Sequence, residues 1–142
     1  MKRLFLMVFA LVVGSAGVTY AAASLLTSSV LTVNKVLLFA PTTIAISTTT
    51  SAAIATGGLS LVGVQLPAAF TGTTLTFQIS FDGVTYQPVY TSTSGTALSY
   101  TVAAGHYVAV NPQDFYGANY IKLISGSSEA AARTFSVALK GL

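Results

Sequence analysis

Hydrophobic and polar residues alternate most clearly between Thr74 and Ser80. Leu75, Phe77 and Ile79 fall on one face of an extended chain, and the residues between them, all polar, fall on the other. Alternation with a period of two predicts a β-strand that buries one of its faces. The apolar face is therefore predicted to form part of a hydrophobic core.

Short runs of the same kind, rich in Val, Ile, Thr, Tyr and Phe, recur from Thr42 onward and are separated by Gly, Pro, Asn and Ser. They predict strands near residues 43–47, 52–55, 59–66, 73–80, 85–90, 97–102, 106–110, 120–124 and 134–139. About eight or nine short strands at this spacing are typical of an all-β fold, an antiparallel β-sandwich of jelly-roll type. We therefore predict one β-sandwich domain over residues 42–142.

Three segments between these runs carry turn signals. Asp82 and Gly83 stand between two strand-like runs and predict a type I′ hairpin turn, in which both central residues have positive φ. The sequence NPQDFYG, residues 111–117, predicts a single helical turn, because Asn is a good cap and Pro suits the first helical position. The sequence SSEAAAR, residues 127–133, predicts a second short helical turn.

The first 23 residues have the features of a leader. Two basic residues precede an apolar stretch over residues 4–13, and small residues end the segment at Ala23, which predicts a signal peptide that is cleaved before Ser24. No charged residue lies between Leu4 and Asn34, so an uncleaved leader would be an apolar helix long enough to anchor the chain in a membrane. Both alternatives place the residues after about 40 on the outer side of the membrane.

Residues 24–41 are predicted to be an apolar connecting segment, either a helix or a first strand. Pro41 is expected to end it, because proline lacks a backbone N–H and restricts the residue before it. Residues 1–40 are the part of the chain expected to contact a membrane.

Charge is scarce in this chain. Hydrophobic residues make up 53% of the sequence and charged residues only 6%, against about 25% in typical soluble domains. Without the leader, four scattered basic residues face three acidic ones, a net charge of +1. This is too little positive charge for nucleic-acid binding through phosphate contacts.

The few ionisable residues form no catalytic signature. His106 is the only histidine, and the chain has no cysteine, so a zinc site would lack ligands. A glycosidase needs two paired carboxylates, whereas Asp82, Asp114 and Glu129 each occupy a separate turn-like context. A Ca²⁺ site at Asp82 would need further oxygen ligands nearby. We predict no enzymatic activity, no cofactor and no catalytic or metal-binding residue, and a small secreted hydrolase is the weakest of the functional hypotheses.

Tyrosines are the residues with the clearest binding potential. Tyr86, Tyr90, Tyr107, Tyr116 and Tyr120 recur in the second half of the chain. A tyrosine can fill the core, contribute to a subunit interface or stack on a sugar ring. These five are the candidate interface or ligand contacts.

Four stretches carry a resemblance to a known group of proteins. They are GVQLPAAFTGTTLTFQ at 63–78, the S-x-D-G-x-T-Y turn at 80–86, V-x-x-N-P-x-x-F-x-G at 108–117 and YIKLISG at 120–126. Over about residues 57–142 the chain resembles small bacteriophage proteins from virion structural gene clusters. In layout it is also similar to discoidin-type jelly rolls. The leader departs from the phage group, whose members often lack one.

The resemblance implies a virion structural or accessory component rather than a reaction. We therefore predict a non-enzymatic structural component of a virion or extracellular assembly, which associates with copies of itself or docks on a capsid protein. The alternative is an exported carbohydrate-binding or adhesion module that binds a glycan through tyrosine, Asn or Asp side chains at one end of the sandwich.

Overall fold

The computed structural model describes residues 37–91 and 94–141, and the structural statements below concern these residues. The chain divides into two units, Met1–Asn34 and Lys35–Leu142, and the described residues belong to the second. The predicted leader, residues 1–23, and most of the predicted connecting segment, residues 24–41, lie outside the described residues. No helix in the described part is long and apolar enough to cross a membrane.

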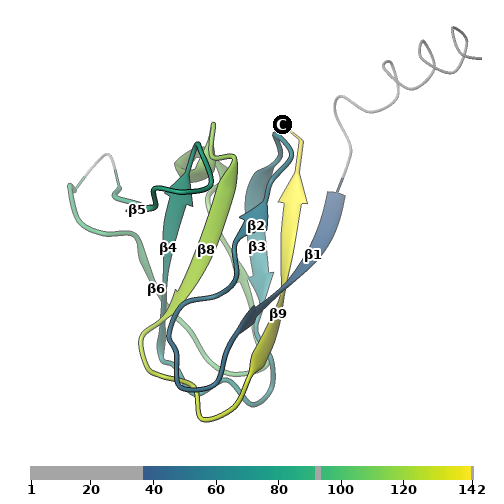
Figure 1. Cartoon of the computed structure of the whole chain (residues 1–142), viewed down its shortest axis with the longest axis vertical. Coiled ribbons are helices and arrows are strands. Elements are labelled where there is room, and N and C mark those ends of the chain that lie inside the picture. Colours follow the sequence, from purple (N-terminus) through teal and green to yellow (C-terminus); the bar gives the residue numbers. More distant parts are fainter. Residues whose placement is uncertain (1–36, 92–93, 142) are drawn as a thin grey trace, which may run out of the picture. The chain divides into compact units, whose positions relative to one another are not determined.

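Two antiparallel sheets form the second unit, as the strand pattern predicts (Figure 1). The first sheet has the order β1-β9-β3-β7, and the second has the order β2-β8-β4-β5, with β6 also paired to β4. Their bounds are β1 Leu37–Ile44, β2 Ile54–Ala55, β3 Ser60–Gln65, β4 Thr74–Ser80, β5 Gln87–Pro88, β6 Ser99–Thr101, β7 Tyr107–Ala109, β8 Tyr120–Ser125 and β9 Arg133–Lys140. The all-β sandwich is confirmed, and each predicted strand has a counterpart.

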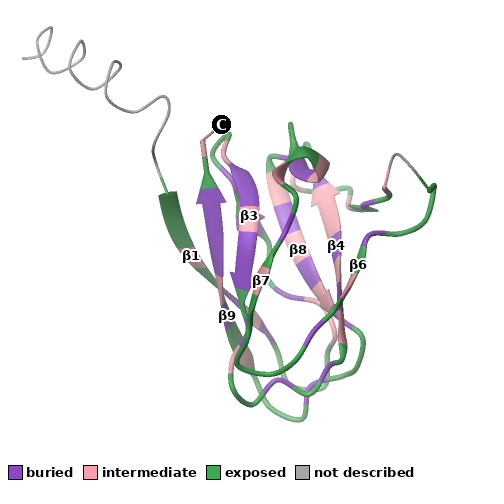
Figure 2. Cartoon of the chain, turned by 180° about the vertical axis from the view of Figure 1, so that it is seen from behind, coloured by how far each residue is buried: buried purple, intermediate pink, exposed green. Residues whose placement is uncertain are grey.

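The core lies between the two sheets, and both supply its side chains (Figure 2). In β4 the expected alternation holds for Leu75 and Phe77, which are buried, while Ile79 is half-buried. The Phe77 ring lies at the centre of the core. It makes edge-to-face contacts with Phe115, at 5.1 Å between ring centroids, and with Tyr100, at 5.9 Å.

The first strand differs from the prediction. β1 begins at Leu37 and continues through Pro41, which pairs with Ser136 of β9. The sandwich therefore extends at least five residues before the expected start at 42, and Pro41 does not end the preceding segment. The physical reason is that β1 is an edge strand, where a residue without an N–H can face away from the neighbouring strand and remove no ladder hydrogen bond.

The two predicted helical turns have different outcomes. A 3₁₀ turn, η1 Pro112–Phe115, is confirmed: the Asn111 side chain accepts a hydrogen bond from the Gln113 N–H, and Gly117 has a φ of 78°. The turn predicted at 127–133 is wrong, because residues 126–132 form an irregular loop before β9. Its Glu129 points inward instead of facing solvent.

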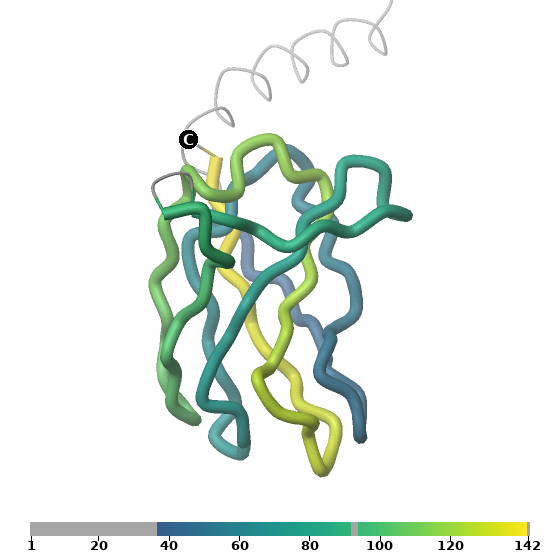
Figure 3. The backbone as a smooth tube through the Cα atoms, turned by 90° about the vertical axis from the view of Figure 1, so that its left-hand side faces the viewer, coloured from purple at the N-terminus to yellow at the C-terminus, as the bar shows by residue number. Residues whose placement is uncertain are grey.

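The loops gather at two opposite ends of the sandwich (Figure 3). We call the end formed by loops 45–51, 66–73 and 126–132 the clasp end. We call the end formed by loops 56–59, 81–86 and 111–119 the site end. Strands β4 and β8 run between them, because β4 starts at Thr74 near the first and finishes at Ser80 near the second, about 20 Å away.

Candidate ligand-binding site

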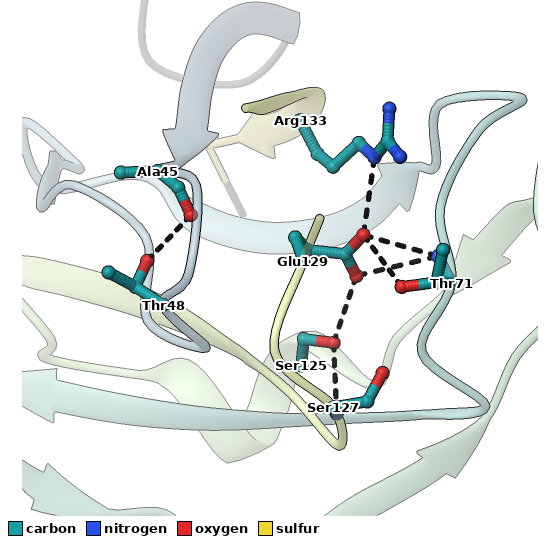
Figure 4. A network of polar contacts seen from close by, with 7 residues as sticks. All are labelled: Ala45, Thr48, Thr71, Ser125, Ser127, Glu129 and Arg133. Atoms are coloured by element: carbon teal, nitrogen blue, oxygen red, sulfur yellow. Dashed lines mark hydrogen bonds and ion pairs between the residues drawn. The ribbon is translucent and has the colours of Figure 1, made fainter. Parts of the chain in front are cut away.

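A buried carboxylate holds the clasp end together (Figure 4). Glu129 is 1% exposed. Its side chain accepts hydrogen bonds from the Thr71 hydroxyl at 2.9 Å, from Arg133 Nε at 3.2 Å and from the Ser125 hydroxyl at 3.3 Å. Its backbone N–H donates to Thr48 O, and its carbonyl accepts from the Ser47 N–H. One residue therefore joins all three loops of this end.

The charge of Glu129 is compensated where it lies. Burial raises the pKa of this carboxyl, but the hydrogen bonds from Thr71, Arg133 and Ser125 outweigh burial and bring its pKa below the ordinary value of 4.5. Because both carboxylate oxygens accept hydrogen bonds from the chain itself, the role of Glu129 is structural. The Glu129 network is therefore closed and leaves neither carboxylate oxygen for a ligand.

At the site end, a different acid shapes a loop. Asp82 Oδ1 accepts hydrogen bonds from the Ser80 hydroxyl at 2.8 Å and from the backbone N–H groups of Val84 at 2.9 Å and Thr85 at 2.8 Å. Gly83 has a φ of 76°, but Asp82 does not have a positive φ. The expected type I′ turn is therefore wrong. The hairpin closes only at Ile79 and Gln87, and the Asp82 carboxylate replaces a tight turn as the group that orders the loop.

The same carboxylate keeps one oxygen free. The hydrogen bonds from Thr85, Val84 and Ser80 lower the pKa of Asp82 to about 2, so the side chain is charged at neutral pH. All three bonds reach Oδ1. Oδ2 makes no hydrogen bond with a described residue, and the side chain is exposed. A fixed, ionised acceptor thus faces solvent.

Phe81 lies beside this acceptor with 67% of its surface exposed. Its place is fixed through the backbone: Asn119 Nδ2 donates to Phe81 O at 2.8 Å, and the Asn119 N–H donates to Ser80 O at 3.1 Å. The Asn119 carbonyl accepts from the Thr56 N–H, which connects loop 56–59 to the same residue. An exposed aromatic ring is therefore held on an ordered backbone at the meeting point of three loops.

Two depressions border Phe81 and Asp82. One, of about 350 Å³, is also lined by Gly57, Gly58, Asn119 and Tyr120. The other, of about 230 Å³, is also lined by Thr85, Gln87 and Pro88. A side-chain Cβ built at Gly57 or Gly58 would meet no atom within 4 Å. The surface of the larger depression at these two glycines is therefore open to a ligand.

The five candidate tyrosines do not form one cluster. Tyr120 lines the larger depression, and Tyr116 is exposed in the adjoining loop. Tyr86 lies under Lys122, whose Nζ is 3.8 Å from the ring centroid. Tyr90 bridges to Ala97. Tyr107 is near the clasp end, because it pairs with Gln65 at the far end of β3.

The three acids are likewise separated. Asp82 is at the site end, Asp114 is in η1 and Glu129 is at the clasp end. No group of three His, Cys, Asp or Glu side chains in the described segments is arranged to hold a metal ion. His106 is exposed near the clasp end, after the Ala103–Gly105 turn. The groups that meet at the site end, the Phe81 ring and the side chains of Asp82 and Asn119, can contact a ligand and exchange hydrogen bonds with it.

Comparisons with known proteins do not identify a family for this chain. No protein-family model matches the chain, and no curated protein matches it. Among solved structures, it is similar to CBM32-1, a carbohydrate-binding module of a family 31 glycoside hydrolase from Clostridium perfringens, with 15% identity and a TM-score of 0.44, over 71% of this chain and 75% of that one. A likeness this distant does not bear on the ligand. The comparisons give no support to a phage origin, which stays a prediction.

Sequence reasoning missed Phe81 and Asn119. Phe81 continues the series Leu75, Phe77, Ile79, so the pattern alone assigns it to the core. It is exposed because β4 ends at Ser80. Asn119 stands directly before β8, and no neighbouring residue marks it as a contact between loops.

Proposed function

We propose that the sandwich is a non-catalytic module that binds a carbohydrate at the site end. The observation that carries this proposal is the exposed ring of Phe81 held next to the free Asp82 Oδ2 and to Asn119. An aromatic ring contributes apolar contact area at low entropic cost, and the C–H face of a sugar ring can lie on it. Carboxylate and amide oxygens accept hydrogen bonds from the sugar hydroxyls.

The fixed geometry supports this proposal. Asp82 and Asn119 are both held by hydrogen bonds to the chain, so little further order must be imposed when a ligand binds. Asn119 Oδ1, like Asp82 Oδ2, makes no hydrogen bond within the described segments. Asp82 and Asn119 line the larger depression together with Phe81, an arrangement of few polar groups around an apolar surface that is typical of small-ligand sites.

Binding to a panel of soluble polysaccharides, measured by affinity electrophoresis and calorimetry, tests the proposal. We expect Phe81→Ala to weaken binding at least about tenfold, which is about 1.4 kcal/mol. Ile46→Ala is the matched control, since Ile46 is 61% exposed at the clasp end, and it should leave the affinity unchanged. Equal effects of the two substitutions, or no binding to any polysaccharide, would refute the proposal.

A second function, self-association, is favoured by the free edge of β1. This strand pairs with β9 on one side, and on the other only its last residues meet the described part of the chain, through the bridge of Ile44 to Ser51. Its first residues, Leu37, Leu38 and Phe39, are all exposed. An apolar edge strand is a template for pairing with another chain. Low net charge adds little repulsion between copies. Self-association of this kind fits a structural role in a virion or extracellular assembly. The exported or virion location that goes with this role is likewise a proposal.

Sedimentation equilibrium of the chain from Ser24 tests self-association. Wild-type protein is expected to form dimers or larger species at micromolar concentration, and Phe39→Lys should shift it to monomer, because a charge on the edge opposes strand pairing. Ile46→Lys adds the same charge at another exposed site and should not. A wild-type protein that stays monomeric up to millimolar concentration would rule this function out.

A further inference from the structure

We propose that the site end binds the interior of an uncharged sugar chain of at least two residues that crosses Phe81, and not a single terminal sugar. This inference rests on the proposed carbohydrate function and specifies its ligand. It follows from the positions of the two depressions, from their sizes and from the polar groups that line them.

The two depressions adjoin one another at two shared lining residues, Phe81 and Asp82, which we call the ridge. Phe81 and Asp82 line both of them, whereas Asn119 lines only the larger and Gln87 only the smaller. A ligand confined to either depression would therefore meet only part of this surface. A chain that crosses the ridge would place one sugar in each depression and pass over the aromatic ring between them.

The volumes favour a ligand that uses both. The larger depression, about 350 Å³, is near the lower end of the roughly 300–1,000 Å³ found for small-molecule sites. The smaller, about 230 Å³, is below that range. One sugar in one shallow depression would bury little surface, and its affinity would be correspondingly low.

Polar groups are available on both sides of Phe81. The larger depression has the Asn119 amide and the Tyr120 hydroxyl, and the smaller has the Thr85 hydroxyl and the Gln87 amide, which is exposed. These groups donate and accept hydrogen bonds in the manner that sugar hydroxyls require. Asp82 is the only charged lining residue. Its negative charge disfavours uronic acids and other anionic sugars.

The test uses neutral β-1,4-glucan, xylan, mannan, chitin and α-1,4-glucan oligosaccharides of one to six residues, titrated into ¹⁵N-labelled protein and followed by NMR. In the series that binds, we expect affinity to rise at least about tenfold between one and four residues. The amide signals of Thr85 and Gln87 should shift with longer chains but not with the monosaccharide. Hexauronic acids of matched length should bind more weakly.

Gln87→Ala separates the two depressions. It should remove the gain from chain length, whereas Gln65→Ala, the same substitution near the clasp end, should leave the gain intact. Affinity that does not depend on chain length, or a Gln87→Ala variant that retains the full gain, would overturn the inference but not the proposed function. If no oligosaccharide binds, both fail.

Discussion

The sequence context of Asp82 suggests two roles, of which the structure shows the first and the proposed function would supply the second. Asp-Gly between two strand-like runs indicates a turn, and a carboxylate at a loop tip indicates a ligand contact. The two carboxylate oxygens differ in the structure: Oδ1 orders the loop, and Oδ2 faces solvent. The sequence pattern located the reversal of the chain but not its geometry, because the loop is ordered by the contacts of Asp82 with Ser80, Val84 and Thr85.

Gly83 gives a prediction at this scale. Its φ is 76°, and a Cβ there would lie 3.0 Å from a Tyr120 ring carbon. Gly83→Ala should therefore cost about 1–2 kcal/mol of unfolding free energy from the backbone, and more from the displaced ring. Gly95→Ala is the control, because Gly95 has a φ of 62° with no atom within 4 Å of its Cβ.

Urea unfolding of both glycine variants measures the difference. We expect the larger loss for Gly83→Ala, accompanied by weaker sugar binding, since Tyr120 lines the larger depression. Equal losses and unchanged binding would mean that the Tyr120 ring moves aside without consequence.

Among the elements, β4 marks the boundary of what pattern alone could predict. Period-two alternation located the strand and placed Leu75 and Phe77 in the core, because one face of β4 packs against the other sheet. The period-two pattern does not predict the residue at which the strand ends. Asn119 donates hydrogen bonds to the backbone carbonyls of Ser80 and Phe81. This contact between distant segments ends the strand so that the Phe81 side chain faces outward. The fold was predictable from local signals, while the site depends on contacts between loops.

Phe77→Ala tests the part of β4 that was predicted. Phe77 is 1% exposed and packs edge-to-face on two rings, so its removal should lower the unfolding free energy by about 3–5 kcal/mol. Ile46→Ala, at an exposed position, should change it by less than about 0.5 kcal/mol. Thermal and urea unfolding give both values. A loss below about 1 kcal/mol for Phe77→Ala would contradict the assigned core.

The sandwich, as far as the structure describes it, has one closed end and one open end. At the clasp end a buried carboxylate satisfies the loops that it joins, and at the site end an exposed carboxylate keeps an oxygen free. Both acids have a pKa below its ordinary value in the folded chain. The loops of both ends are therefore ordered by an ionised carboxylate, Glu129 at the clasp end and Asp82 at the site end.

Acid should therefore destabilise the fold. A depressed carboxyl pKa contributes stability above the unfolded value and loses it as the pH falls through the folded value. For Glu129 the loss begins near 4.5, and for Asp82 it extends from 3.8 to about 2. We expect the melting temperature to fall steadily from pH 5 to about pH 2.

The Glu129→Gln variant separates the contribution of Glu129 to the pH dependence of stability from that of Asp82. At pH 7 it should cost about 3 kcal/mol, because Arg133 loses the charge that it faces in a buried pair. It should also flatten the decline of melting temperature near pH 4. An unchanged profile in calorimetry between pH 2 and pH 7 would show that the Glu129 network does not stabilise the ionised form.

The cross-strand pair of Leu37 and Lys140 has a practical consequence for any experiment that immobilises this protein. It brings the first residue of β1 and the last residue of β9 together at the same end of the sandwich as Phe81. A tag, carrier or bead attached at either residue would crowd the proposed sugar site and could mask binding. The exposed Ala103–Gly105 turn, near the clasp end, is the better place for a label or surface linkage, because it leaves Phe81 free to meet a long polysaccharide.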